Sequence, residues 1–523
     1  MVPKLSDDQY AKLRLVVVLS CSFGLAALLT GRQIFQANWG MIDDHEIFRW
    51  LGRNHHLPLS QVWHVLMSDT EIGLPTERYR PAYYFFKILE TVVFGDNVHL
   101  WYLGRTLGFA LFLSAAWWWM RPFAGILASG AMTIYLASLP LWSGIWSRLG
   151  PSEIYGATCV GICLYATYGI LRSDSPTIRV LSAFLLSATT VVMIGMKETF
   201  IPLAAGPFLV LLIAGIRRKL PPFVAILSIA IMVVGSLAIV IPVAARVRAM
   251  SQDTYANAVG SAAMVQFGSS GLLTAIRSTW FLMVVPVVMF PIQLRKSCVW
   301  WRTPATFVAL IYVFLIGMYA LQSALYRATF PFGMRYDFPA MLLVPVTMCV
   351  VCCWAIHGLQ SAGAFKISRI AQVAMIATFL YASFAGLKDP YSIRGAVVAN
   401  IYRTTKFYPT ISQAAEAAKQ FPNSPIILEA YGPGAYEPVY SLRTYLSSLG
   451  AENTVSVRVH SDSAIHTNFL DGLMREVRRM EIDGAGGFTP LGNVIGLTPG
   501  GCISIGIDGA ADRGCRALEV KSE

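Results

Sequence analysis

The residues of this chain that could do chemistry lie in five short charged motifs between apolar stretches, at residues 42–46, 77–81, 147–153, 196–199 and 333–339. In the first motif two acids, Asp43 and Asp44, are adjacent. Because each carboxylate raises the pKa of its neighbour, one of them could act as a general base. The alternative is a solvated helix start, where the helix dipole favours acidic side chains.

The second motif offers cations. Arg78 and Arg80 flank Tyr79 and precede Pro81, a residue favoured in the first turn of a helix. Two guanidinium groups beside a helix start form a fork that suits a phosphate. Alternatively, both arginines extend along apolar surface to place their charges at a membrane interface.

The other three motifs each combine a cation with an acid or a tyrosine. They contain Arg148 and Glu153, Lys197 and Glu198, and Arg335 and Tyr336. Each could be a simple charge pair at a helix end. Their position on one side of a membrane is a stronger indication, and it follows from the elements that hold them.

Those elements are mainly transmembrane helices. Of the 523 residues 55% are hydrophobic and 13% charged, against about 25% charged in an average soluble domain. This composition excludes a disordered, collagen-like or coiled-coil protein and argues against an ordinary cytosolic enzyme. With roughly 20 apolar residues per span, it predicts about eleven spans. They lie near residues 13–33, 98–119, 122–142, 154–171, 180–196, 201–216, 222–244, 279–294, 304–322, 337–356 and 370–386.

The basic residues indicate how the spans are oriented. Loops on one side are short, basic and nearly free of acids, as is typical of cytoplasmic loops. Their basic residues are Arg121, Arg172, Arg179, Arg217, Arg218, Lys219, Arg295, Lys296, Arg302, Lys366 and Arg369. The N-terminus is then cytoplasmic, and the C-terminal segment and all five motifs lie outside. The net charge of +12 reflects insertion, so no nucleic-acid partner is expected.

The predicted organisation has two parts, a transmembrane domain over 1–387 and an extracytoplasmic α/β domain over 388–523. Residues 34–97 form a first outer loop that is too long for a plain connector. Within it, 44–52 and 81–94 are expected to be amphipathic helices at the membrane surface.

Strands alternate with helices in the C-terminal part, which predicts a partly parallel sheet. The expected elements are a helix at 411–420, a strand at 425–430, a helix at 436–447, a strand at 454–459, a helix at 466–480 and a strand at 502–507. In an oxidising compartment Cys502 and Cys515 could form a disulfide, and free thiols are the alternative.

A few carboxylates and several cations on one membrane face suit sugar transfer from a polyprenyl-phosphate donor. A phosphate is already a good leaving group, so the reaction needs no strong general acid. It needs one carboxylate to accept the proton of the acceptor hydroxyl and cations to hold the developing phosphate charge.

On these residues the membrane half resembles the GT-C superfamily of integral-membrane glycosyltransferases, especially the bacterial relatives of protein O-mannosyltransferases and aminoarabinose transferases. The residues that carry the resemblance are Asp43-Asp44, Arg-x-Arg-Pro at 78–81, Arg148 with Glu153, Lys197-Glu198 and Arg335-Tyr336. The resemblance implies a polyprenyl-phosphate sugar donor, inversion at the anomeric carbon and an extracytoplasmic active site. The acceptor would be a lipid, a glycan or a protein.

By the same resemblance Asp43 is the base and Asp44 its support. The family more often has Asp-Glu at this place, so the choice between the two acids stays open. Some members use a divalent cation and others need none, so the metal stays unassigned. Histidines crowd the same loop, and we interpret them as interfacial residues: His45, His55, His56 and His64.

Three other functions compete with this one. A transporter or flippase of lipid-linked sugars also has many spans, but it usually places ionisable residues at span centres. A glycan polymerase or ligase would use similar chemistry on a larger donor. A non-catalytic scaffold would need no acidic pair beside an arginine fork. The working location is a bacterial inner membrane with the C-terminal domain in the periplasm.

Overall fold

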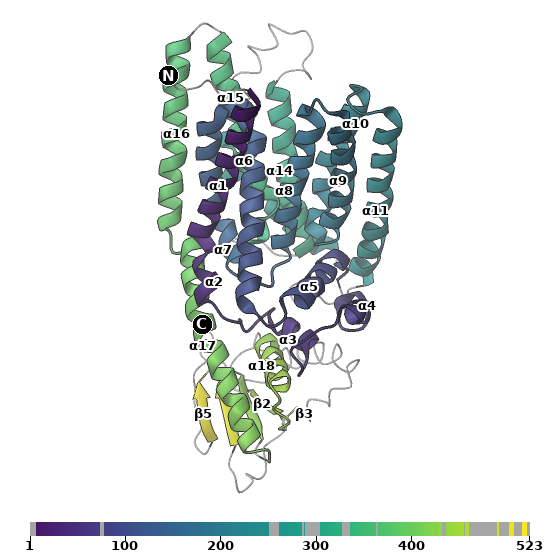
Figure 1. Cartoon of the computed structure of the whole chain (residues 1–523), viewed down its shortest axis with the longest axis vertical. Coiled ribbons are helices and arrows are strands. Elements are labelled where there is room, and N and C mark those ends of the chain that lie inside the picture. Colours follow the sequence, from purple (N-terminus) through teal and green to yellow (C-terminus); the bar gives the residue numbers. More distant parts are fainter. Residues whose placement is uncertain are drawn as a thin grey trace. The chain divides into compact units, whose positions relative to one another are not determined.

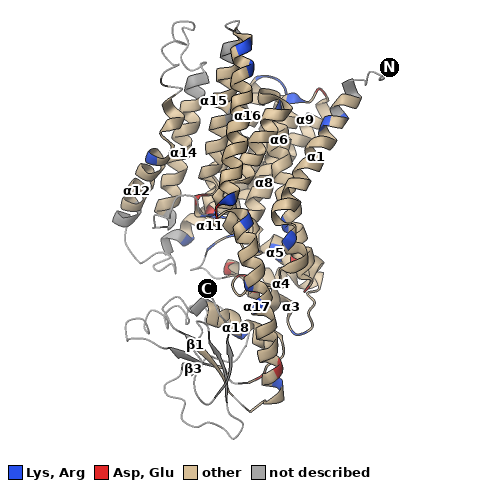
Figure 2. Ribbon diagram, turned by 90° about the vertical axis from the view of Figure 1, so that its left-hand side faces the viewer, with Lys and Arg blue, Asp and Glu red and all other residues tan. Residues whose placement is uncertain are grey.

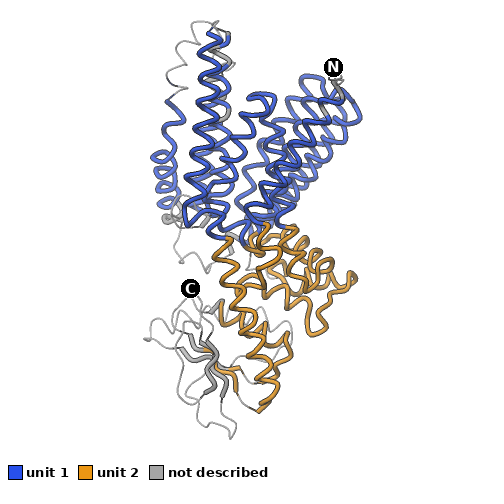
Figure 3. The backbone as a smooth tube through the Cα atoms, turned by 60° about the vertical axis from the view of Figure 1, so that its left-hand side comes forward, with its two compact units in different colours: residues 1–30, 105–147, 152–396 blue, residues 31–104, 148–151, 397–523 orange. Residues whose placement is uncertain are grey.

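The computed structural model describes residues 7–73, 78–249, 261–284, 287, 304–326, 335–361, 364–423, 425–430, 436–453, 455–459, 489–490, 502–506 and 515–519. The chain divides into two compact units (Figure 3). Unit 1 contains residues 1–30, 105–147 and 152–396, and unit 2 contains residues 31–104, 148–151 and 397–523.

Unit 1 is a bundle of long helices (Figure 1). They are α1 Asp7–Thr30, the main part of α6 Val98–Ala137, α8 Glu153–Arg172, α9 Pro176–Ile194, α10 Ala205–Ile216, α11 Pro222–Ala249, α12 Ser261–Thr279, α14 Pro304–Tyr326, α15 Leu343–Ser361 and α16 Phe365–Lys388. Local signals set some boundaries. Ser175 caps α9 by accepting the Ile178 N–H, and Pro176 follows at the first helical position.

The surface of this bundle is apolar. Leu28, Ile216 and Phe223 are each largely exposed, as expected of side chains that face lipid. In Figure 2 most Lys and Arg residues of the bundle lie near helix ends. The protein is thus mainly helical and belongs in a membrane.

Among the described residues six helices are long and apolar enough to cross a membrane, and the bent pair Val98–Ala137 and Pro140–Trp146 would make a seventh. About eleven spans were predicted. α14 also contains an apolar helical stretch, at Val308–Ala324, and a second one at Ala340–Ile356 includes most of α15. Most of the predicted span at 279–294 lies outside the described residues.

α6 contains two helical arms rather than one rod. Gly125 has a φ of 78°, outside helical geometry. The Trp117 indole N–H donates to the Ile126 carbonyl at 3.0 Å, and a Cβ on Gly130 would lie 2.8 Å from the Trp117 ring. In a straight helix residues 117 and 130 would be about 20 Å apart. The chain therefore folds back at Gly125, and the arms correspond to the predicted helices at 98–119 and 122–142.

Unit 2 combines short helices with a small sheet. Its helices are α2 Arg32–Gln36, α3 His45–Leu51, α4 Val62–Ser68, α5 Pro81–Phe94, the main part of α17 Ile393–Gln420, and α18 Tyr436–Ser448. α3 and α5 confirm the helices predicted at 44–52 and 81–94, whereas α4 was not predicted.

The core of unit 2 joins α3 to α18. The Phe48 ring lies 4.7 Å from the Tyr445 ring and 5.0 Å from the Trp39 ring, measured between centroids. The Tyr445 hydroxyl donates to the Gly40 carbonyl at 2.7 Å, and the Ser441 hydroxyl donates to the carbonyl of Met41. These contacts fix the segment that leads into the acidic pair.

The sheet has the strand order β3-β2-β1-β4-β5, and every pairing in it is parallel. Its strands are β1 Ile426–Ala430, β2 Val455–Val459, β3 Thr489–Pro490, β4 Cys502–Gly506 and β5 Cys515–Glu519. β1, β2 and β4 confirm three predicted strands. The helix predicted at 466–480 lies outside the described residues. The register pairs Cys502 with Cys515, and a disulfide between them stays a prediction.

Candidate functional site

The two adjacent acids enter different environments at the start of α3. Asp43 has a φ of 71°, the left-handed region that few residues other than Gly and Asn or Asp adopt. Its side chain is 32% exposed. Asp44 is only 3% exposed, and its Oδ2 accepts the Gly40 N–H at 2.7 Å. One carboxyl is thus accessible and the other is enclosed.

Burial also changes the ionisation of the enclosed acid. It raises the pKa of Asp44 to about 7, although the Gly40 N–H and the Lys87 ammonium oppose the shift. Burial also lowers the pKa of His45 to about 4, so this imidazole is neutral at physiological pH. Near pH 7 Asp44 can exist with or without its proton.

Lys87 of α5 holds the acidic segment in place, and the sequence interpretation missed it. Its side chain is fully buried. Its Nζ donates to the Asp43 carbonyl at 3.0 Å, to Glu46 Oε2 at 2.7 Å and to the Tyr83 hydroxyl at 3.1 Å. Burial alone would raise the pKa of Glu46, but Lys87 and the other basic groups around the carboxylate together lower it. The sequence signal that could have identified Lys87 is a lysine on the apolar face of a predicted helix.

A tight turn brings a cation to Asp43. Arg148 Nη2 lies 3.4 Å from Asp43 Oδ2. Two residues on, a Cβ on Gly150 would lie only 2.0 Å from the Asp43 Cβ. The Tyr83 hydroxyl donates to the Gly150 carbonyl at 2.7 Å, which ties the turn to α5. The glycine thus permits a close approach that any other residue would block.

Arg80, one of the two arginines of the predicted fork, pairs with an acid. The Arg80 guanidinium donates twice to Glu71 Oε2, at 2.5 and 3.1 Å, and lies over the rings of Tyr83 and Tyr84. Its charge is therefore matched within the protein. Arg78 and Tyr79 are half-buried in the segment before α5.

A second charged cluster lies in unit 1, where three predicted motifs meet. Lys197 Nζ lies 2.5 Å from Glu153 Oε1, and both side chains are buried. Lys197 also lies 5.7 Å from the Tyr336 ring centroid. Arg335 lies over the same ring and donates to the Tyr336 hydroxyl at 2.9 Å. Glu198 begins the 3-10 helix Glu198–Ala204 and is half-buried.

The Arg335 segment is anchored to α14. The Gln322 amide donates to the carbonyls of Tyr336 and Phe338, at 2.8 and 2.9 Å. The Tyr319 hydroxyl donates to Asp337 Oδ1 at 2.8 Å. These bonds hold Arg335 and Tyr336 at the start of the predicted span at 337–356.

Arg105 is a further buried cation that the sequence interpretation missed. It is 2% exposed on α6, and its Nη2 donates to the Tyr155 hydroxyl at 3.0 Å. A buried arginine in a membrane helix is costly and usually functional. A lone Arg inside an apolar run was the signal that could have found it.

Seven of the eleven predicted site residues therefore lie in two clusters, one within each unit. Asp43, Asp44 and Arg148 belong to unit 2, and Glu153, Lys197, Arg335 and Tyr336 belong to unit 1. Within the described part of the chain no three His, Cys, Asp or Glu side chains are grouped to hold a metal ion. The first cluster offers proton transfer, and the second offers cations beside a tyrosine.

No protein-family model matches the chain, and no curated protein matches it. Among solved structures the chain is similar to ArnT from Cupriavidus metallidurans bound to undecaprenyl phosphate, with 14% identity and a TM-score of 0.40 over 91% of this chain and 89% of that one. The apo state of the same protein gives 12% identity and a TM-score of 0.42, over 90% and 89%.

The chain is also similar to the Archaeoglobus fulgidus oligosaccharyltransferase in the apo form, with 12% identity and a TM-score of 0.39 over 84% of this chain and 64% of that one. Similarity at this level leaves the roles of individual residues to the geometry of this chain.

Proposed function

We propose that the chain is an inverting membrane glycosyltransferase that moves a sugar from a polyprenyl-phosphate donor to a lipid, glycan or protein hydroxyl outside the cytoplasm. The observation that carries the proposal is the contrast between two adjacent acids. Asp44 is buried with its pKa raised to about 7, whereas Asp43 is accessible and faces Arg148. An accessible carboxylate held in a fixed backbone conformation suits a general base.

In the proposed step Asp43 accepts the proton of the acceptor hydroxyl. The acceptor oxygen attacks the anomeric carbon from the face opposite the phosphate, and a new C–O bond forms. The old C–O bond breaks, and the polyprenyl phosphate leaves with the electron pair. Lys87 positions Asp43 through its backbone carbonyl, and the Gly150 turn fixes its side chain.

The unit 1 cluster is proposed to bind a phosphate group. Lys197 and Arg335 carry two positive charges against the one negative charge of Glu153, which leaves a net +1 for these three. A cation with a neighbouring tyrosine hydroxyl can bind phosphate oxygens by charge-assisted hydrogen bonds. Arg335 and Tyr336 would make the contacts, and the Lys197–Glu153 pair would position them.

Lesser roles fall to the remaining predicted residues. Arg80 is proposed to position α5, because Glu71 already matches its charge. Arg78, Tyr79 and Glu198 stay as candidates for substrate contact.

The proposal keeps the predicted arrangement in the membrane. About eleven spans, a catalytic domain over 1–387, a cytoplasmic N-terminus and a periplasmic domain over 388–523 are all part of it. The short basic loops support this orientation. The proposed location is a bacterial inner membrane.

The experiment that tests the proposal is mass spectrometry of surface glycans and glycolipids from a deletion strain. The strain is complemented with the wild type, with Asp43→Asn and with Asp96→Asn, whose exposed carboxylate in unit 2 serves as the matched control. We expect the deletion to remove a single sugar and only Asp43→Asn to fail in restoring it. The loss of a general base lowers turnover by about 10²–10⁴-fold.

Three outcomes would contradict parts of the proposal. Full rescue by Asp43→Asn would remove the base assignment. Intact glycan retained on the cytoplasmic side would indicate transport of lipid-linked sugar instead of transfer. Loss of a whole repeat unit, rather than one sugar, would indicate a polymerase or ligase.

A further inference from the structure

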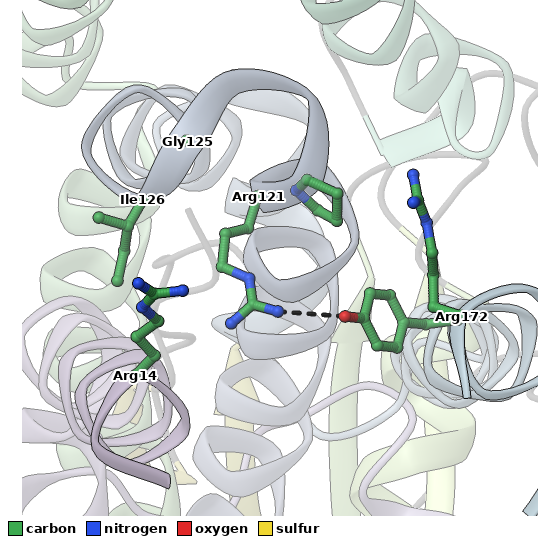
Figure 4. Close-up of a pocket in the computed structure, with 7 residues that line it drawn as sticks. Arg14, Arg121, Gly125, Ile126 and Arg172 are labelled. Carbon is green, nitrogen blue, oxygen red and sulfur yellow. Dashed lines mark hydrogen bonds between the residues drawn. The ribbon is translucent and has the colours of Figure 1, made fainter. Parts of the chain in front are cut away.

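Unit 1 contains a pocket that none of the proposed chemistry uses. Its volume is about 400 Å³, and it lies where α1, the bend of α6 and the end of α8 meet. It is lined by Arg14, Arg121, Pro122, Gly125, Ile126, Tyr168 and Arg172. Figure 4 shows that the three arginines come from three different elements. Segments far apart in the sequence thus contribute cations to one cavity.

The lining of this pocket is strongly positive. Three of its seven residues are arginines and none is acidic, so the lining carries +3. Within the described part of the chain, no ion pair involves Arg14, Arg121 or Arg172. Like charges around one cavity repel each other. An anion would relieve this repulsion.

The partners of Arg121 in the structure are uncharged, so they orient its guanidinium group without neutralising it. Its Nη2 donates to the Tyr168 hydroxyl at 3.1 Å, the bond dashed in Figure 4. Its guanidinium lies 3.7 Å from the centroid of the Trp118 ring. Both contacts fix the geometry of the group without cancelling its charge.

The bend of α6 brings the start of a helical arm to the same pocket. Gly125 interrupts the helix, and the second arm begins at Ile126. The first N–H groups of a helix have no intrahelical acceptor, and the helix dipole is positive at this end. An anion in the pocket would therefore meet backbone donors as well as guanidinium groups.

The position of the pocket, near the ends of two candidate spans, suits a lipid headgroup. Arg14 lies near the start of the candidate span Lys12–Thr30, and Arg172 ends the candidate span Glu153–Arg172. Both therefore lie near the end of a helix that is long and apolar enough to cross a membrane. Apolar side chains on the same elements are exposed, namely Leu13, Val16, Phe123 and Leu127. They offer a surface along which acyl chains can lie.

We infer that this pocket binds the phosphate headgroup of an anionic membrane lipid. The site goes beyond the proposed sugar transfer, because it contains neither the proposed base nor the cluster around Arg335. Its ligand is a structural or regulatory lipid rather than a reactant.

The test measures lipid retention by the full-length protein. The protein is reconstituted in nanodiscs with equal amounts of phosphatidylglycerol and phosphatidylcholine, and native mass spectrometry gives the ratio of the two lipids retained. We expect enrichment of phosphatidylglycerol on the wild type. In Arg14→Gln/Arg172→Gln the affinity should fall about 30-fold, at about fivefold per arginine.

Arg217→Gln/Arg218→Gln is the matched control. It removes two exposed arginines that do not line the pocket, and it should keep the enrichment. Arg121 is left unchanged because Tyr168 and Trp118 tie it to the fold. The single variant Arg14→Gln, at an exposed position of α1, should lose about fivefold even if the double variant fails to fold.

A separate arm distinguishes the lipid from free phosphate. Glycerol 3-phosphate carries a phosphate without acyl chains, and we expect no displacement of phosphatidylglycerol by it. Displacement at the lipid's own concentration would overturn the lipid assignment in favour of a soluble phosphate ligand. Unchanged enrichment in the pocket variants, or equal loss in the control, would overturn the site itself.

Discussion

The two clusters of charge in this chain are built on different principles. In unit 1 Glu153 and Lys197 are buried and 2.5 Å apart, so each ion has its partner. In unit 2 Asp43 is accessible and only 3.4 Å from Arg148, while the adjacent Asp44 is buried with a pKa raised to about 7.

This difference suggests a structural role for the unit 1 pair and a reactive role for the unit 2 acids. A buried pair whose charges match can fix the geometry of its surroundings. The two adjacent acids of unit 2 differ in burial and therefore in behaviour. Asp43 stays accessible to a substrate, whereas Asp44 changes its charge near neutral pH. The unit 1 pair should therefore govern stability, and the unit 2 acids should govern turnover and pH response.

The largest expected effect on stability is that of Lys197→Met. The substitution leaves the Glu153 carboxylate buried without its ammonium partner, and such a loss costs about 3–5 kcal/mol. The free energy of unfolding in detergent, measured by chemical denaturation, checks this value. If the unit 1 pair were as accessible as Asp43, the loss would be below about 1 kcal/mol.

Two controls accompany this variant. Lys419→Met breaks an exposed pair with Glu416 and should change the free energy of unfolding by less than about 1 kcal/mol. The double variant Glu153→Gln/Lys197→Met removes both charges and should recover most of the loss. No recovery in the double variant would show that packing, rather than the unpaired ion, causes the defect.

The second prediction concerns Asp44 and pH. Because burial raises the pKa of Asp44 from 3.8 to about 7, the folded chain binds this proton more tightly than the unfolded chain. The stabilisation is complete below about pH 4, declines as the pH rises, and is lost above about pH 7. A shift of this size corresponds to at most about 4 kcal/mol.

Asp44→Asn removes this dependence, and the quantity to measure is the difference in stability between wild type and variant from pH 4 to pH 8. His45 titrates in the opposite sense, because its pKa is lowered to about 4, and it is present in both proteins. The difference should fall as the pH rises. A difference that is constant with pH would show that Asp44 is not the buried acid of the pair.

Local patterns in the sequence predicted part of this arrangement. The acidic pair, the helices α3 and α5, and strands β1, β2 and β4 each follow from residues within a few positions of one another. Helix starts such as Ser175-Pro176 and the long apolar runs are signals of the same local kind. These features therefore needed no knowledge of the tertiary structure.

The ion-pair partners of the charged residues could not be predicted from the sequence, for a physical reason. Glu46 pairs with Lys87 across 41 positions, and Glu153 pairs with Lys197 across 44. Such pairs depend on how helices pack, which spacing along the chain does not encode. The same holds for Arg80, because no local pattern indicates its pairing with Glu71.

The smallest expected stability effect is that of Gly150→Ala, and it tests whether Asp43 needs its close turn. A Cβ there would lie 2.0 Å from the Asp43 Cβ, so the turn or the acid must shift. Overpacking of this kind costs about 1–3 kcal/mol. Turnover should fall further than stability, because the shift moves the proposed base. Gly24→Ala, where no atom lies within 4 Å, is the matched control and should leave turnover unchanged. Wild-type turnover in Gly150→Ala would show that the accessible acid tolerates displacement, and the contrast between the two clusters would then rest on burial alone.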